Sequence, residues 1–328
     1  MQLKYISIIW LVSLLAVITS CKEDEYAIPV LPSGLHNDCI KHSLGPGVIG
    51  TNMVFAYAMA LKPEEGKLIS AQVEASIPGA EGTYLSNQSL YTDNSGNNKG
   101  ITVGEPSVTS GKVTTVTFNV DTCAATLRFY YKIPEAARGQ TVSFKFTAKA
   151  SNGQTVSYDM GPYEVRKMDM KLDLVATDPT ACFVSIADMA IYDAATAAAN
   201  PGKVDLVYLY RSITGITFNH ALMSPVADPM YLRDVTLPAG LTNKTKVFKT
   251  WNIQDQQLAR LQYGVYVDDL DFEKMDFTGA PDYALNTRTE SGLWVETSDG
   301  KYRAYIFINK TDNAGKKLTF SMKRLQMK

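Results

Sequence analysis

The chain has 328 residues, of which 45% are hydrophobic and 20% charged, a balance typical of globular rather than disordered proteins. This length is enough for two domains of ordinary size. The formal charge is −1, and it becomes −2 once residues 1–20, which hold one lysine and no acid, are removed. Because no basic surplus is available to neutralise phosphates, nucleic acid is not an expected partner.

The first 20 residues predict a signal peptide that ends at a lipidation site. An apolar core of about 15 residues runs from Tyr5 to Thr19, which is shorter than the roughly 20 residues that span a bilayer. Cys21 follows a small residue, as in bacterial lipoproteins that are cleaved and acylated there, although Ile18-Thr19-Ser20 departs from the usual triplet. The alternative is a plain signal peptide with an unrelated cysteine. No later apolar run has spanning length, so we expect the mature chain to be anchored to a membrane and not embedded in it.

The residues after Cys21 predict an acidic tag and a tether. Residues 22–25, Lys-Glu-Asp-Glu, resemble the tag that follows the acylated cysteine in surface-exported lipoproteins of Bacteroidales-type bacteria. This resemblance implies an outer-membrane lipoprotein that is exposed at the cell surface. Residues 21–35 also carry Pro29, Pro32 and Gly34 among small and charged residues, which is typical of a tether.

Residues 36–167 predict an all-β domain. Apolar residues recur at period two in short runs, at 48–61, 67–77, 113–120, 126–133, 141–150 and 155–160. The polar stretch 86–100 is expected to be a surface loop, and Asn152-Gly153 a hairpin turn. Short strands without helices between them predict a β-sandwich of immunoglobulin-like kind. The Cys–Trp–Cys pattern of immunoglobulin domains is missing, because this stretch contains no tryptophan.

Residues 168–328 predict a β-rich (α+β) domain with a few short helices. Strands are expected at 172–175, 182–186 and 203–210, a helical turn at 194–199, and a three-stranded meander at 292–297, 301–309 and 317–324. Asn252 is expected to cap a helix over 253–263 that ends at Gly264. The predicted fold class is therefore mainly β: an immunoglobulin-like sandwich followed by a β-rich domain.

The remaining cysteines predict at most one disulfide. Cys39 and Cys123 fall in the same predicted domain and are the more plausible pair, in a compartment that permits disulfides. The alternative is that Cys39, Cys123 and Cys182 are buried free thiols. No two cysteines have zinc-ligand spacing, and Gly45–Gly50 matches a dinucleotide fingerprint by letter without the strand and helix that it needs. With no G-x-S-x-G or H-E-x-x-H motif either, no catalytic residue, metal or cofactor is predicted.

An acidic cluster lies between Val267 and Phe277. Its members are Asp268, Asp269, Asp271, Glu273 and Asp276. They are interpreted first as the solvated face of a short helix. Two alternatives remain open: a weak calcium site using Asp269, Asp271 and Glu273, and a pair of carboxylates that hydrolyses glycosides.

The second predicted domain is rich in aromatic residues. The candidate ligand-binding residues are Trp251, Tyr266, Tyr283, Trp294 and Tyr302. Flat aromatic faces can stack on sugar rings, while neighbouring carboxylates and amides bind the hydroxyl groups. The alternative is that these side chains belong to the core and hydrogen-bond through a polar end.

Together, the leader with Cys21, the acidic tag, the sandwich and the segment 258–269 look like a family of uncharacterised two-domain Bacteroidales lipoproteins. This family is similar in layout to the lipoproteins that accompany outer-membrane glycan importers. The resemblance implies a cell-envelope protein held by its lipid, with a glycan ligand or an outer-membrane protein partner. The first hypothesis is therefore a non-enzymatic glycan-binding component. The alternatives are a structural or assembly subunit of a surface complex, and an envelope glycoside hydrolase that uses Asp268–Asp276.

Overall fold

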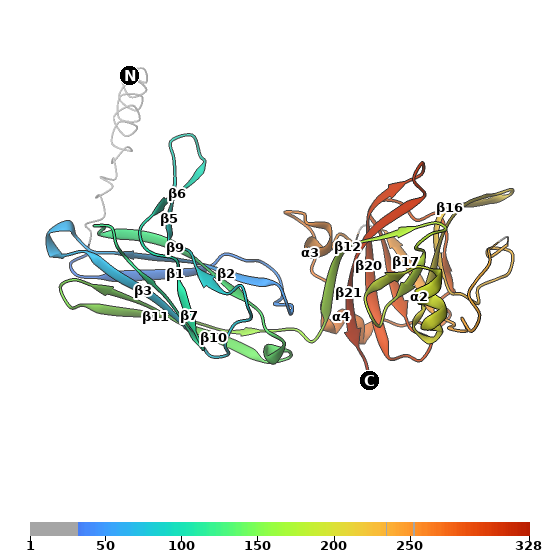
Figure 1. Ribbon diagram of the computed structural model, residues 1–328, viewed down its shortest axis with the longest axis horizontal. Helices are drawn as coiled ribbons and strands as arrows, with labels where there is room; N and C mark the ends of the chain where they lie inside the picture. Colours follow the sequence, from blue (N-terminus) through green and yellow to red (C-terminus); the bar gives the residue numbers. More distant parts are fainter. Residues whose placement is uncertain (1–31, 234, 252) are drawn as a thin grey trace, which may run out of the picture. The chain divides into compact units, whose positions relative to one another are not determined.

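The first domain is a β-sandwich of two antiparallel sheets. In the computed structural model, which describes residues 32–233, 235–251 and 253–328, one sheet has the order β1-β2-β9-β4 and the other the order β11-β10-β3-β8-β7 (Figure 1). The strands are β1 (His36–Lys41), β2 (Asn52–Ala60), β3 (Leu68–Ala75), β4 (Tyr84–Leu85), β7 (Val108–Ser110), β8 (Val113–Thr117), β9 (Ala124–Lys132), β10 (Thr141–Ala150) and β11 (Thr155–Glu164). The predicted leader, the Cys21 lipidation site and the Asn252 cap lie outside the described residues.

Aromatic residues fill the space between these two sheets. Phe55 of β2 packs against Phe144 and Phe146 of β10, with ring centroids 4.7 and 5.4 Å apart. The alternate residues Ala56 and Ala58 point to the other face of β2, because successive side chains of a strand alternate between faces. The period-two pattern of the sequence is thus the pattern of burial, and the predicted sandwich is confirmed.

The polar stretch 86–100 is not the loop that its composition predicts. It contributes to a hairpin of β5 (Gln88–Thr92) and β6 (Asn98–Thr102), which pair in register. The carboxylate of Asp93 closes the turn by accepting the backbone N–H groups of Ser95 and Asn97, each at 2.9 Å. Because the hairpin is largely solvent-exposed, its sequence lacks the alternation that reveals a half-buried strand.

The three cysteines within the described residues are free thiols, so the predicted Cys39–Cys123 disulfide is wrong. Cys39 on β1 pairs with Tyr57 on β2, and Tyr57 pairs with Leu127 on β9. Cys123 therefore lies two strands and four residues away from Cys39, well over 10 Å, which no disulfide can bridge. Burial raises the pKa of the Cys39 and Cys182 thiols to about 12, so they remain protonated at neutral pH.

The second domain contains two five-stranded sheets, with the orders β12-β21-β20-β19-β17 and β14-β13-β15-β16-β18. The strands are β12 (Asp169–Thr177), β13 (Phe183–Ser185), β14 (Ala190–Tyr192), β15 (Leu206–Ile213), β16 (Ile216–Met223), β17 (Lys246–Trp251), β18 (Tyr283–Ala284), β19 (Ser291–Glu296), β20 (Tyr302–Asp312) and β21 (Lys317–Gln326). The predicted meander is confirmed as β19, β20 and β21.

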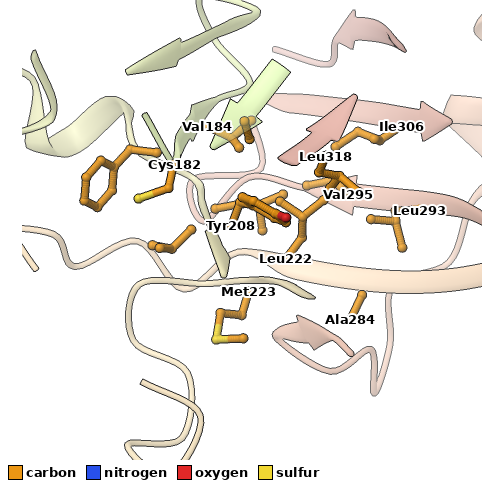
Figure 2. Close-up of a cluster of buried hydrophobic side chains, with 14 of the residues drawn as sticks. Cys182, Val184, Tyr208, Leu222, Met223, Ala284, Leu293, Val295, Ile306 and Leu318 are labelled. Atoms are coloured by element: carbon orange, nitrogen blue, oxygen red, sulfur yellow. The ribbon is translucent and has the colours of Figure 1, made fainter. Parts of the chain in front are cut away.

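An apolar core joins the two sheets of the second domain. Figure 2 shows Tyr208 and Leu222 of one sheet close to Val295 and Leu318 of the other. All four side chains are fully buried, and they belong to one cluster of 29 buried residues. Burial on this scale is the main stabilising contribution to such a fold.

The α-helices in the described residues are short. They are α2 (Ala194–Ala199), α3 (Gln256–Ala259) and α4 (Asp269–Lys274). The helix expected over 253–263 is wrong in its bounds, because the Asp255 carboxylate accepts the N–H groups of Gln257 and Leu258 and so starts α3 only at Gln256. Arg260 then adopts a left-handed conformation (φ 56°) and ends the helix after one turn. Within the described residues, no helix is long and apolar enough to cross a membrane.

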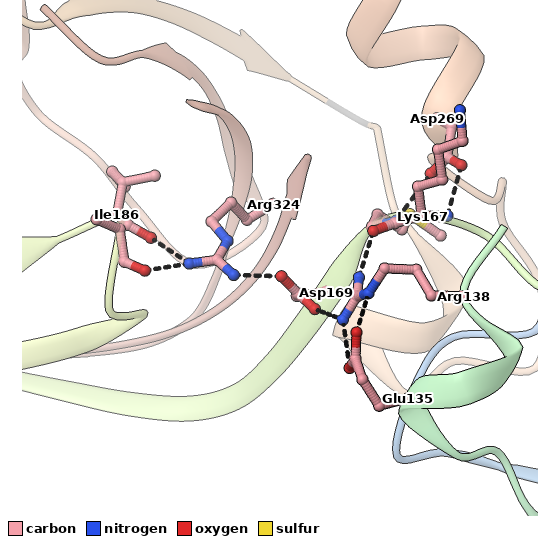
Figure 3. A network of polar contacts seen from close by, with 9 residues as sticks. Glu135, Arg138, Lys167, Asp169, Ile186, Asp269 and Arg324 are labelled. Atoms are coloured by element: carbon pink, nitrogen blue, oxygen red, sulfur yellow. Dashed lines mark hydrogen bonds and ion pairs between the residues drawn. The ribbon is translucent and has the colours of Figure 1, made fainter. Parts of the chain in front are cut away.

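The segment that joins the two domains is held by polar contacts (Figure 3). The Asp269 carboxylate of α4 accepts the N–H groups of Lys167 (2.7 Å) and Met168 (3.1 Å). Asp169 binds Arg138 of the first domain through one oxygen (2.6 Å) and Arg324 of β21 through the other. Two cations thus share one carboxylate at the start of the second domain.

Candidate ligand-binding site

The five aromatic residues predicted to bind a ligand do not form one platform. Trp294 is only 6% exposed, and its ring packs against Tyr305 (4.8 Å) and Phe272 of α4 (5.5 Å). β19 lies between β17 and β20, and α4 covers the face of the sheet to which Trp294 points. Trp294 is therefore a core residue, and its predicted role in binding is wrong.

The side chain of Tyr266 is held in place by contacts within the protein. Its hydroxyl donates to Oε1 of Gln256 at 2.6 Å. Its ring lies directly against Gly45, where an added Cβ would come within 2.3 Å of Cε1. Gly45 also has a positive φ of 80°, so a glycine suits this position on both counts. The ring of Tyr266 is thus packed against the Gly45–Gly50 turn, which joins β1 to β2.

Trp251 and Tyr283 lie at the surface of the second domain. Trp251, on the outer strand β17, is 50% exposed, and Nζ of Lys249 lies 5.8 Å from its ring centroid. Tyr283 lines a shallow cavity of about 320 Å³ together with Phe248 and Lys249, and it packs on Tyr231. Trp251 is not among the residues that line this cavity.

Tyr302 is the predicted residue that lies among polar groups. We call its surroundings the polar pocket, a cavity of about 170 Å³. The pocket is lined by Ala187, Gly202, Lys203, Asp205, Asn243, Thr297, Ser298, Asp299 and Tyr302. These residues come from the turn between β13 and β14, the turn before β15, the segment before β17, and the turn that leads from β19 into β20. The tertiary fold thus assembles the pocket from four separate parts of the chain.

Asp205 is the buried carboxylate of the polar pocket. The residue is 4% exposed, and its Oδ2 accepts the N–H of Ile186 at 2.8 Å. Burial raises the pKa of this carboxyl to about 7, and the nearby charge of Asp299 adds to the increase. Near neutral pH the group is therefore divided between a hydrogen-bond acceptor and a protonated donor.

The other walls of the polar pocket are held by local hydrogen bonds. Asp299 accepts the hydroxyl of Thr297 (2.7 Å) and the N–H of Lys301 (2.9 Å), and the backbone bond holds its pKa below the usual value. The amide of Asn243 donates to the carbonyls of Gly202 (3.0 Å) and Val204 (2.9 Å). These contacts orient the polar groups before any ligand is bound.

The ring of Tyr302 is close to two cations. The guanidinium of Arg324 is 4.9 Å from the ring centroid, and Nζ of Lys301 is 5.4 Å from it. Such cation–π contacts hold the ring in place. Tyr302 thus contributes a fixed wall to the polar pocket and is not an open stacking platform.

Most carboxylates of the acidic cluster accept hydrogen bonds from backbone N–H groups of the protein itself. Asp268 caps α4 by accepting the N–H of Leu270, and Asp271 accepts the N–H of Asp268 in return. Asp269 holds the domain junction, and Asp276 accepts the N–H of Thr278. Among the described residues, no group of three or more His, Cys, Asp or Glu side chains is placed to hold a metal ion. Of the three calcium candidates, Asp269 and Asp271 accept hydrogen bonds from backbone N–H groups, and Glu273 lies exposed on α4.

Sequence reasoning missed three residues of the polar pocket, namely Asp205, Asn243 and Asp299. The sequence does contain a signal for Asp205, because its carboxylate interrupts the strongly apolar run 203–210. A charged residue inside such a run is rarely buried without a reason. Asn243 and Asp299 gave no comparable signal, since both occur in loops where polar residues are common.

Two family models match the chain. One is described as a domain of unknown function, DUF4466, and matches residues 32–165, and the other is described as a domain of unknown function, DUF8576, and matches residues 166–327. They divide the chain two residues before the predicted boundary at 167/168. No curated protein matches the chain.

The chain is similar to proteins of solved structure. A DUF4466 family protein from Parabacteroides merdae is 45% identical, with a TM-score of 0.84 over 90% of this chain and 99% of that chain. The 35 kDa C-terminal fragment of the major pilin of Streptococcus agalactiae is 12% identical, with a TM-score of 0.28 over 56% of this chain and 74% of that one. The major pilin subunit of Bacillus cereus is 10% identical, with a TM-score of 0.28 over 87% and 62%. The two pilin scores are too low to support an argument.

Proposed function

This chain belongs to the DUF4466 family, and from that premise we propose that it is a non-enzymatic lipoprotein of the cell envelope that captures a glycan. The proposed binding site is the polar pocket of the second domain. Its position at the cell surface is proposed from the leader sequence, Cys21 and the acidic tag.

The polar pocket is the observation that carries the glycan proposal. Sugar hydroxyl groups are both donors and acceptors, and the pocket offers the carboxylates of Asp205 and Asp299 together with the hydroxyls of Thr297 and Ser298. These groups are oriented by existing hydrogen bonds, which lowers the entropic cost of binding. A cavity of 170 Å³ is smaller than a pocket for a drug-sized molecule, so it suits one sugar ring or the end of a glycan chain.

Variants of the polar pocket should lose glycan binding. An array of plant and host polysaccharides would identify a ligand for residues 22–328, and isothermal titration calorimetry would then compare variants. We expect Asp205→Asn and Tyr302→Ala to weaken binding by about tenfold or more, because each removes a group from the pocket wall. Tyr302→Phe should bind better than Tyr302→Ala, because it keeps the ring and its contacts with Lys301 and Arg324.

Trp251→Ala is the matched control for this experiment. It removes an exposed aromatic side chain that lies outside the polar pocket, so we expect its affinity to equal that of the parent chain. If Trp251→Ala or Tyr283→Ala abolished binding and the pocket variants did not, the aromatic surface would be the site. Failure to retain any saccharide would contradict the proposal.

A lipid on Cys21 is the expected basis for the location. Mass spectrometry of the protein from membranes should find a mature chain that begins at Cys21 and carries fatty acids, and Cys21→Ser should release the protein from the membrane fraction. A chain recovered unmodified, or with residues 1–20 still attached, would contradict an anchored role. The calcium-site and hydrolase interpretations of Asp268–Asp276 are not proposed, because most of these carboxylates bind backbone N–H groups.

The second candidate function is that of a subunit in a surface protein complex. One observation favours it: the segment after α3 exposes Leu261, Tyr263 and Val265 at 41%, 78% and 51%. Exposed apolar side chains close together are typical of protein contacts. Recovery of a stable outer-membrane protein with this chain, lost in Tyr263→Ser, together with no saccharide binding, would favour this candidate over the first.

A further inference from the structure

Another cavity of the second domain lies at the opposite end of β15 from the polar pocket. We call it the arginine pocket; its volume is about 630 Å³. It is lined by Tyr210, Arg211, Ser212, Ile213, Thr214, Met230 and Arg233. Asp205 of the polar pocket and Arg211 are six residues apart on an extended strand, which corresponds to about 20 Å. The two cavities are therefore separate sites in the same domain.

The two arginines of this pocket are unpaired within the part of the chain that the structure describes. Neither Arg211 nor Arg233 forms an ion pair with a described carboxylate; Asp234 lies outside the described residues. In addition, Nε of Arg211 is buried and has no hydrogen-bond partner. A buried donor without a partner is unfavourable, so Arg211 is a charged side chain whose donors the described residues do not fully satisfy.

The lining of the pocket indicates the chemistry of an acceptor for these donors. The guanidinium group presents a planar set of donors that matches the oxygens of a carboxylate or a sulfate. Tyr210, Ser212 and Thr214 also line the cavity and carry hydroxyl groups, and among the described residues no carboxylate lines it. Ile213 and Met230 add an apolar wall, and the volume is far larger than a single anion requires. The ligand is thus an anionic group carried on a larger molecule.

We propose that the arginine pocket binds the oxyanion of an acidic saccharide, either the carboxylate of a uronic acid or a sulfate ester, through Arg211 and Arg233. That the ligand carries an oxyanion is inferred from the arginine pocket alone. That this oxyanion belongs to a saccharide rests on the proposed function. The polar pocket is lined by two carboxylates, Asp205 and Asp299, and its one cation, Lys203, is paired with Asp188, so it suits the same group less well. The two sites therefore select different parts of a ligand, or different ligands.

Titration calorimetry with defined probes tests the proposal. The probes are tri-galacturonic acid for the carboxylate, a sulfated chondroitin disaccharide for the sulfate, and galactotriose as the neutral comparison. We expect at least one acidic probe to bind and the neutral one to bind more weakly. Combining Arg211→Met with Arg233→Met should weaken binding of the acidic probe by about tenfold or more, and raised salt should weaken it in the parent chain.

Arg260→Met is the matched control, because Arg260 is exposed and paired with Asp173 away from this pocket. It should bind the acidic probe like the parent chain, and circular dichroism should show that all variants are folded. The double variant should still bind galactotriose like the parent chain, so that failure of the polar pocket and failure of the arginine pocket are distinguished. Equal binding by the double variant would overturn the proposal. If the protein bound only vesicles of anionic phospholipid, or only inorganic sulfate, the proposal that a saccharide carries the oxyanion would be overturned.

Discussion

Replacing Lys323 by methionine should lower the free energy of unfolding by about 3 to 5 kcal/mol. Lys323 of β21 and Asp255, the cap of α3, are both fully buried, and Nζ lies 2.6 Å from Oδ2 of Asp255. Burial lowers the pKa of the lysine, and the charge of Asp255 opposes this decrease. Methionine fills the space of the lysine stem but leaves a charged carboxylate without its cation. Urea unfolding followed by tryptophan fluorescence would measure the loss, because Trp294 lies in the core of this region.

Two further variants make this prediction specific. Lys67→Met removes a lysine of the same shape from an exposed pair with Asp121, and we expect it to change stability by less than about 1 kcal/mol. Combining Lys323→Met with Asp255→Asn removes both charges, so this double variant should be more stable than the sum of the single losses predicts. A loss below about 1 kcal/mol for Lys323→Met would show that the buried pair does not stabilise the fold.

The stability of Asp205→Asn relative to the parent chain should increase by about 2 kcal/mol between pH 5 and pH 8. Burial raises the pKa of Asp205 to about 7, whereas an unfolded aspartate has a pKa near about 3.9. The folded state therefore holds a proton on this group at pH 5, when the unfolded state has largely lost it. As the pH rises through the folded pKa, the parent chain must bury a charge and loses stability. Asparagine keeps the shape and the acceptor for the N–H of Ile186, but it does not ionise.

Urea unfolding at a series of pH values would measure this difference. Asp121→Asn is the matched control, because the carboxylate of Asp121 is on the surface. The stability of this variant should change with pH as that of the parent chain does. A constant difference between Asp205→Asn and the parent from pH 5 to pH 8 would contradict a displaced titration at Asp205. It would also remove the protonated form as a donor to a ligand in the polar pocket.

Much of the fold could be predicted because the relevant signals are local. The meander of β19, β20 and β21 follows from apolar alternation and from turns such as Asp299-Gly300, which need only neighbouring residues. The first sandwich follows for the same reason. The hairpin of β5 and β6 escaped prediction because neither of its faces is buried enough to leave a pattern.

The site was less predictable because burial of an aromatic residue depends on what covers its face of a sheet. Trp251 and Trp294 both lie in strands, but α4 packs over Trp294, while Trp251 lies on the outer strand. The bounds of α3 were missed for a similar reason: Asp255 is held by Lys323, which is 68 residues away in the sequence. Such contacts have no trace in a local pattern.

The sequence by itself determined the mainly β class, the two-domain order and the strands with one buried face, because side chains of a strand alternate at every second residue and turns use a few residue types. Only the tertiary structure decided which aromatic residues are buried, that Cys39, Cys123 and Cys182 are free, and that Asp205, Asn243 and Asp299 surround one cavity. The physical reason is that these properties arise from the packing of segments that are far apart in the chain.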